Sequence, residues 1–190
     1  MLVLVALLLS SSGRAQTNAT VAVRRDNTEL TRVFEEDQRV RQAKPLGPEE
    51  PKITRSDADR LALVKQMLAN DHVRTTADYF HAALVLQQSP SSTDYLVAHT
   101  LAVLCAAYHN TTCLWLSAAT LDRYLQSVNQ PQIYGSQYLH FNDPPVTQQP
   151  YTVDVISNSI RSKLGVPGLI EQAEQLNTYQ RQVAAPKVKP

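Results

Sequence analysis

The sequence contains few glycines and cysteines, and neither sign of charge is in excess. Its 190 residues include five Gly, two Cys and one Trp, and 18 basic residues face 17 acidic ones. No glycine-rich phosphate loop, Gly-x-Ser-x-Gly elbow or His-Glu-x-x-His motif occurs. A nucleic acid requires a basic face for its phosphates, so this composition argues against nucleic acid as a partner.

The two cysteines, Cys105 and Cys113, have no third or fourth partner with metal-ligand spacing. The sequence therefore predicts no metal site and no cofactor. Two interpretations of the pair remain. Export from the cytoplasm would permit a disulfide, and the expected tight turn between two helices would allow it geometrically. Alternatively, both are buried free thiols that act as small hydrophobic side chains.

Long apolar runs are also missing, apart from one at the N-terminus, Leu2 to Leu9. This run is shorter than the roughly 20 residues that span a bilayer. Small residues follow at Gly13 and Ala15, which predicts a secretory signal peptide over residues 1–15. A membrane anchor or a buried helix is the alternative. Cleavage would remove one basic residue and no acidic one, leaving a formally neutral chain. We expect a secreted or periplasmic protein with no stable membrane anchor after cleavage.

Apolar residues recur at helical spacing in seven segments. The predicted helices cover about Thr28–Gln42, a segment following Ser56, Thr75–Gln88, Thr93–Tyr108, Cys113–Val128, Val153–Leu164 and Pro167–Tyr179. The fourth is apolar on nearly every face and is expected to be the most buried.

Three helix starts carry capping residues. Ser56 is expected to cap the second helix. Thr75 with Asp78, and Ser91 with Asp94, have the spacing of a capping box with Asp in place of Glu.

These patterns predict an all-α fold, a compact antiparallel bundle with hairpin pairs that resemble tetratricopeptide repeats. A plain antiparallel bundle is the alternative. A single helical domain is expected over 27–182, with disordered segments at 16–26 and 183–190. Residues 129–150 are rich in Pro, Gln and aromatic residues, which indicates one long ordered loop, with a short strand about 133–139.

Three groups of residues could carry function. His81 and His99 would form a metal or acid–base site if their helices pack antiparallel, and otherwise are core histidines. Asp122 lies on the buried stripe of its helix and requires a partner. With Arg123 it is either catalytic or part of a structural salt link that holds the following loop.

The third group is the segment Gln132–Gln137. Gly135 allows a positive φ or a close backbone approach. Tyr134 and the two Gln side chains suit recognition of amides, sugars or peptide backbone, and contain no strong nucleophile. The alternative is a loop that folds back on the bundle and satisfies its own backbone.

Several stretches resemble an uncharacterised family of exported bacterial proteins. They are Asp37-Gln38-x-x-Arg41, Tyr79–Gln88, Asp94–His99, Trp115–Tyr124, Gln130–Gln137 and Arg161–Pro167. The resemblance covers roughly residues 34–180, and its most specific part is Asp122-Arg123 followed by Gln-x-Tyr-Gly-Ser-Gln. It implies an exported α-helical domain and carries no activity over to this chain.

Three hypotheses follow. The first is a binding or interaction module for an unknown protein, peptide or small molecule. The second is a hydrolase-like enzyme that uses His81, His99, Asp122 and Tyr134. The third is a structural role for the polar residues, which would form one buried hydrogen-bonded network. Its members, with neighbours from the same motifs, are Asp37, Gln38, Arg41, Asp122, Arg123, Gln132, Gly135 and Gln137.

Overall fold

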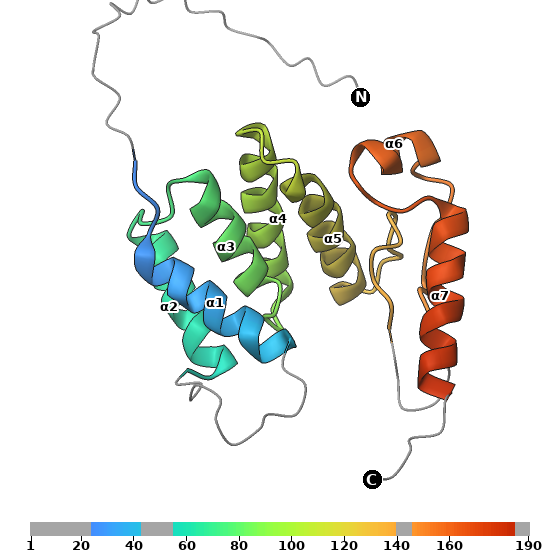
Figure 1. The fold of residues 1–190 in the computed structure, drawn as a ribbon, viewed down its shortest axis with the longest axis horizontal. Helices are drawn as coiled ribbons and strands as arrows, with labels where there is room; N and C mark the ends of the chain where they lie inside the picture. The colour runs from blue at the N-terminus through green and yellow to red at the C-terminus, as the bar shows by residue number, and fades with distance from the viewer. Residues whose placement is uncertain (1–23, 43–54, 140–145, 185–190) are drawn as a thin grey trace, which may run out of the picture.

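The computed structural model describes residues 24–42, 55–139 and 146–184, and every regular element in these ranges is an α-helix (Figure 1). The helices are α1 (Thr28–Gln42), α2 (Asp57–Ala69), α3 (Thr76–Leu86), α4 (Ser92–Ala107), α5 (Thr112–Ser127), α6 (Asn158–Lys163) and α7 (Leu169–Ala184). The predicted all-α helical bundle is confirmed. The signal peptide lies outside the described residues, as do 16–23 and 185–190.

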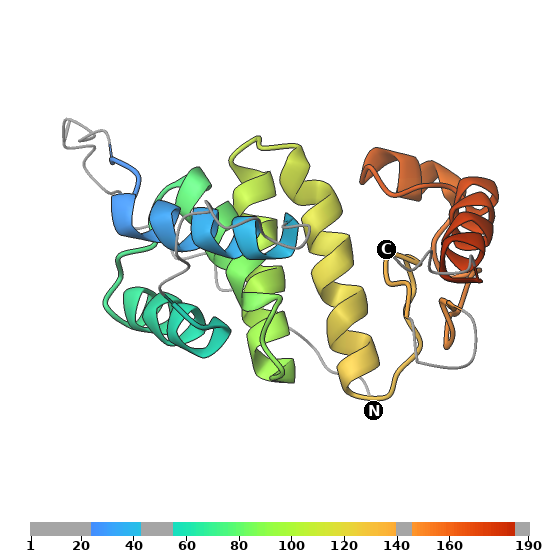
Figure 2. The same cartoon turned by 60° about the horizontal axis from the view of Figure 1, so that its bottom comes forward.

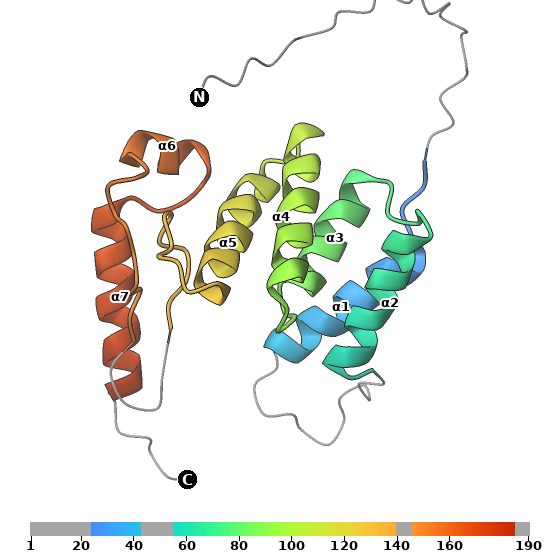
Figure 3. The same cartoon turned by 180° about the vertical axis from the view of Figure 1, so that it is seen from behind.

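Helices α3, α4 and α5 run up and down beside one another, with α1 and α2 packed on the α3 side. Figure 2 and Figure 3 show that the irregular segment after α5 lies between α5 and α7. No helix in the described ranges is both long and apolar enough to cross a membrane.

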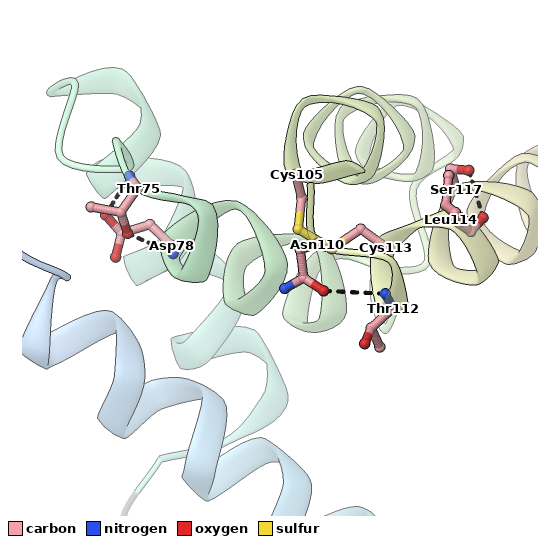
Figure 4. Close-up of a disulfide and its surroundings, with 8 residues drawn as sticks. All are labelled: Thr75, Asp78, Cys105, Asn110, Thr112, Cys113, Leu114 and Ser117. Carbon is pink, nitrogen blue, oxygen red and sulfur yellow. Dashed lines mark hydrogen bonds between the residues drawn. A yellow bond between two sulfur atoms is a disulfide. The ribbon is translucent and has the colours of Figure 1, made fainter. Parts of the chain in front are cut away.

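A disulfide joins the end of α4 to the start of α5 (Figure 4). The Cα atoms of Cys105 and Cys113 are 5.8 Å apart, and both residues are fully buried. His109 has a positive φ of 67°, and the side-chain oxygen of Asn110 accepts the backbone N–H of Thr112 at 3.1 Å. The tight turn therefore brings the two cysteines together, and of the two interpretations the disulfide is the one observed.

Two of the three predicted caps are confirmed. Ser56 with Asp59, and Thr75 with Asp78, form complete capping boxes. The box predicted at the start of α4 is wrong, because Ser91 makes no side-chain cap bond. Its intended partner Asp94 instead accepts the Ser89 hydroxyl and pairs with Lys65 of α2 at 2.6 Å.

Helix α4 is not buried on all sides. Its inner face packs Ala98, Leu101 and Ala102 into the core. Its outer face leaves Leu96, Val97, Val103 and Leu104 between 36% and 47% exposed. The expectation that α4 is the most buried helix is wrong, because its neighbours α3 and α5 cover one face only.

The segment after α5 is longer than expected, because α6 begins at Asn158 rather than near Val153. Ser157 caps α6, and Val153 lies in the irregular chain before it. No strand forms over 133–139, where the one pairing is an isolated bridge at Leu139, and a second isolated bridge lies just before this range at Gln132. At the other end, α7 extends to Ala184, so residues 183 and 184 are helical rather than part of a disordered tail.

Candidate functional site

The site begins with Asp122, a fully buried carboxylate on α5. It accepts the backbone N–H groups of Ile133, Tyr134 and Ser136 at 2.8, 3.0 and 2.9 Å, and the Ser136 hydroxyl at 2.8 Å. The partner that a buried Asp requires is therefore the backbone of the loop. All these contacts go to donors of one turn, so Asp122 fixes the path of the chain from residue 133 to 136.

Arg161 of α6 binds the opposite side of the same turn. It is fully buried and donates to the carbonyls of Tyr134 and Ile133, and to that of Val153 at 3.0 Å. Its guanidinium also lies over the Tyr151 ring, 5.6 Å from the centroid. The carboxylate and the guanidinium thus hold the turn between them, one by its N–H groups and the other by its carbonyls. The peptide dipoles link the two charges.

Glutamine side chains complete this polar core. The Gln132 amide donates to the carbonyls of Gln137 and Gln148 and accepts the N–H of Gln137. Gln148 donates to the Gly135 carbonyl at 2.7 Å. Gln132 is fully buried and Gln148 nearly so. They satisfy backbone groups that have no helical or sheet partner.

Helix α7 contributes Gln172, which is 2% exposed. Its amide nitrogen donates to the carbonyls of Tyr134 and Pro167, and its oxygen accepts the Tyr151 hydroxyl at 3.0 Å. Burial raises the pKa of both Tyr134 and Tyr151, so both phenols are neutral at physiological pH.

Gly135 has the positive φ that the sequence indicated, +77°. A Cβ at this position would lie against the Gln172 side-chain oxygen and 2.6 Å from the Tyr151 hydroxyl oxygen. Both possibilities inferred from the sequence, a left-handed conformation and a close approach, therefore apply here.

The two candidate histidines do not form a common site. His81 stacks on Phe34, with ring centroids 4.2 Å apart, and its burial lowers its pKa. His99 Nδ1 lies 2.9 Å from the Ser117 carbonyl oxygen. Within the described ranges, no group of three or more His, Cys, Asp or Glu residues is arranged to hold a metal ion.

The proposal of a single buried network is wrong, because Asp37 and Arg41 belong to a separate cluster between α1 and α2. Asp37 is 1% exposed and pairs with Arg41 at 3.0 Å and with buried Arg60 at 3.5 Å. Asp57 contacts both arginines, and the Gln38 amide reaches Asp37 at 3.4 Å. No hydrogen bond or ion pair links these five residues to the cluster around Asp122.

Arg123 does hold the loop, but without the expected salt link. Its Nε and Nη2 donate to the Gln137 side-chain oxygen at 3.3 and 3.2 Å, and its Nη1 donates to the Gln87 carbonyl at 2.7 Å. In the part of the chain that the structure describes, Arg123 forms no ion pair with a carboxylate. Burial lowers the pKa of Arg123; nearby Tyr95 raises it, and the charge of Arg41 lowers it. The guanidinium remains cationic, as arginine does in proteins.

Two surface hollows meet at Arg123 and Gln137. The larger, of about 430 Å³, also contains Tyr138, Val146 and Tyr179 in its wall. The smaller, of about 360 Å³, is lined by Tyr95, Gln126 and Leu139 among others. Among the described residues that line either hollow, Arg123 is the only one with a charge.

Larger hollows occur on α7 and beside α6, where the charged lining residues are exposed rather than partly buried as Arg123 is. The described residues that line one of these, of about 740 Å³, all belong to α7. Another of about 640 Å³ lies between α6 and α7, where Glu171 is the charged residue. The hollows at Arg123 thus differ from the larger ones in chemistry.

Sequence reasoning missed four buried polar residues as members of these clusters: Arg60, Gln148, Arg161 and Gln172. For two of them a signal was present. Gln172 lies between Leu169 and Leu176 at helical spacing, and Arg60 precedes Val64 and Met67 in the same way. A polar residue on an apolar stripe indicates burial with a partner.

Comparison of the chain with protein-family models, curated proteins and solved structures finds no match. The functional argument therefore rests on the geometry of the site.

Proposed function

We propose that the protein is an exported binding module whose ligand occupies the two hollows around Arg123. The observation that carries the proposal is the state of this arginine. It is partly buried, and within the described ranges no carboxylate neutralises it. A partly desolvated cation without an opposite charge is unfavourable, which favours a ligand that supplies a negative charge.

The walls of the hollows suit recognition. Tyr95, Tyr138 and Tyr179 offer aromatic surface, and Gln126 and Gln137 offer amides. A few polar groups among apolar and aromatic walls are typical of ligand sites. The apolar run at the N-terminus and the Cys105–Cys113 disulfide support export into an oxidising compartment.

The hydrolase hypothesis has less support. His81 and His99 contact different groups, and the Asp122 carboxylate is occupied by backbone donors. A general base must reach the proton that it abstracts, and Asp122 is fully buried. These residues stabilise the scaffold on which the hollows are built.

Selection from a random peptide library, followed by NMR mapping of the selected peptides, tests the proposal. We expect enriched peptides to shift the backbone amide signals of Tyr95, Gln126 and Tyr179. The substitution Ser127→Trp places an indole in the smaller hollow, at an exposed helical position, and should weaken binding at least tenfold.

Thr112→Trp is the matched control, since it adds the same side chain to an exposed position at the other end of α5. It should leave peptide binding unchanged. A selection that enriches nothing, or peptides that shift a different surface and ignore Ser127→Trp, would show the proposal to be wrong.

A further inference from the structure

We infer that the hollows around Arg123 take the carboxylate of an internal acidic side chain from an extended peptide, with apolar groups of the peptide on either side of it. This inference rests on the proposed function and specifies its ligand. It is argued in three steps, from the hydrogen bonds that the guanidinium leaves unused, from the charge of the walls, and from the arrangement of the two hollows.

The Arg123 guanidinium has more N–H groups than its described partners accept. Arginine carries five N–H groups. Nε and one N–H of Nη2 are donated to Gln137, and one N–H of Nη1 is donated to Gln87. Among the described residues, one N–H on each terminal nitrogen therefore has no acceptor. In the lining of the smaller hollow, the amide nitrogen of Gln126 is also buried and has no hydrogen-bond partner among the described residues. A ligand acceptor at this point would satisfy donors that the protein leaves open.

The charge of the walls selects the type of anion. Arg123 is the only charged residue among those described in the lining, and Arg41 is already paired with Asp37 and Asp57. A phosphate monoester carries a charge of about −1.5 to −2 at pH 7 and would be only partly neutralised here. A carboxylate carries a single charge and has two oxygens that match arginine N–H donors.

The arrangement of the hollows indicates where the carboxylate lies within the ligand. Arg123 and Gln137 line both hollows, so they stand between them. Tyr138, Val146 and Tyr179 supply apolar surface on one side, and Tyr95 and Leu139 supply it on the other. A free C-terminus or a small acid would fill one side only. An acidic side chain between two apolar residues would fill both.

Four synthetic peptides test this on the intact protein by NMR titration. The first is acetyl-Ser-Leu-Glu-Leu-Ser-amide. The second and third have Gln and phosphoserine in place of Glu, and the fourth is acetyl-Leu-Leu with a free carboxylate. We expect the Glu peptide to bind at least tenfold more tightly than each of the other three. It should shift amide signals in both hollows, at Tyr95 and at Tyr179.

Equal affinity for the Glu and Gln peptides at the hollows would overturn the carboxylate inference and leave the proposed function standing. Tighter binding of the phosphoserine peptide would assign the site to a phosphate. Equal affinity for the dipeptide with a free carboxylate would show that the carboxylate does not need to be on an internal side chain, and would overturn that part of the inference. If neither these peptides nor any library peptide shifts the hollow, both the inference and the proposed function are wrong.

The variant Gln126→Glu supplies the missing counterion from within. Residues 123 and 126 are neighbours on one helical face, and both line the smaller hollow. The preference for Glu over Gln peptide should fall to less than twofold in this variant. Thr112→Glu, which adds the same charge at an exposed position at the other end of α5, should keep the preference. Neither substitution removes a partner of the hydrogen bonds from Arg123 to Gln87 and Gln137, so we expect both variants to fold. An undiminished preference in Gln126→Glu would contradict the inference.

Discussion

The buried side chains of helices α1 to α5 are mostly apolar, whereas those of the described chain beyond α5 are mostly polar and hydrogen-bonded. The apolar cluster runs from Leu30 to Leu116 and includes Val64, Leu86 and Leu101. After α5, the buried side chains are mostly polar. They are Gln132, Gln148, Arg161 and Gln172, with Val146 and Val166.

The two regions bury different side chains because their backbone N–H and carbonyl groups are satisfied in different ways. Residues within helices satisfy their own N–H and carbonyl groups, so their side chains are free to be apolar. The segment 129–157 has only two isolated bridges in its described part and must find partners elsewhere. Buried amides, a carboxylate and a guanidinium supply them. Such contacts are directional, so losing one partner leaves another group buried and unsatisfied.

Asp122→Ala should therefore have the largest effect. It removes the acceptor of three backbone N–H groups and one hydroxyl, all at a fully buried position. We expect a loss of about 3–5 kcal/mol in the free energy of unfolding, as for breaking a buried charged pair. Urea denaturation measures the loss, and amide hydrogen exchange should locate it in residues 129–184.

Asp122→Asn is the control for this substitution. It keeps the shape and one acceptor oxygen, so it should cost less than Asp122→Ala. A loss below about 1 kcal/mol for the alanine variant, typical of an exposed pair, would contradict the structural role of Asp122.

Leu86→Ala tests the apolar half. Leu86 is 1% exposed in the core of α3, and we expect a loss of about 3 kcal/mol from the lost burial and the remaining cavity. Unlike Asp122→Ala, it should speed hydrogen exchange across α1 to α5. Exposed Leu96 on α4 provides the matched substitution, which should cost less than about 1 kcal/mol. If Leu86→Ala and Leu96→Ala lowered the free energy of unfolding by the same amount, the core face of α3 and the outer face of α4 would not differ in burial as described.

The same contrast explains what the sequence could predict. The bounds of α1, α3, α4 and α5 followed from apolar spacing to within two residues at each end, because the stability of these helices depends on which face is apolar. For α2 only the start after Ser56 was predicted, and it is confirmed. The start of α6 did not follow from apolar spacing, since Val153 and Val155 suggested an apolar helical start but lie exposed in irregular chain. The box at Ser91 failed for a tertiary reason, because Lys65 and Ser89 take its aspartate.

Residue types at the site were easier to recognise than their partners. Burial of Asp122 and the special conformation of Gly135 both followed from sequence. That the partners of Asp122 would be three backbone N–H groups could not, because the path of an irregular loop has no periodicity to reveal it. For the same reason Gln148 gave no signal, whereas Gln172 carried one in its helical spacing.

Removing the disulfide tests the connection between α4 and α5. Cys105 and Cys113 are eight residues apart, and closing so short a loop contributes about 2.5 kcal/mol in the chain-entropy estimate. We expect the Cys105→Ala, Cys113→Ala double variant to lose about that much. Each single substitution should cost as much as both together, because either one breaks the cross-link. Additive single effects would show that packing of the sulfurs, rather than the bond, stabilises the hairpin.

Tyr138 should make the C-terminal half sensitive to alkali. Burial raises the pKa of Tyr138 to about 12, so the folded protein favours the neutral phenol. This stabilisation is present below pH 10, where the unfolded phenol titrates, and is lost as pH rises towards 12. Because the side chain is partly exposed, we expect an effect of about 1 kcal/mol. Tyr138→Phe should flatten the decline in stability between pH 10 and 12, and an unchanged slope would contradict the shift.

Titration of His81 should have the smallest effect on stability. It should destabilise the protein at low rather than high pH, and in the α1–α5 half. Burial lowers the pKa of His81, although the charge of nearby Asp78 opposes this, so the folded protein favours the neutral imidazole. Its contribution is complete above about pH 6.5 and is lost as pH falls through the lower pKa of the folded state. The side chain is partly exposed, which limits the effect to less than about 1 kcal/mol. His81→Phe retains a ring to stack on Phe34 and removes the titration, so the stability difference between the two proteins should change between pH 7 and 5.

The described residues beyond α5 contain no histidine, so hydrogen exchange in α7 should be the same in both proteins over this pH range, after correction for the intrinsic rate. If α7 responded as strongly as α3, the two halves would be coupled more tightly than their separate cores indicate.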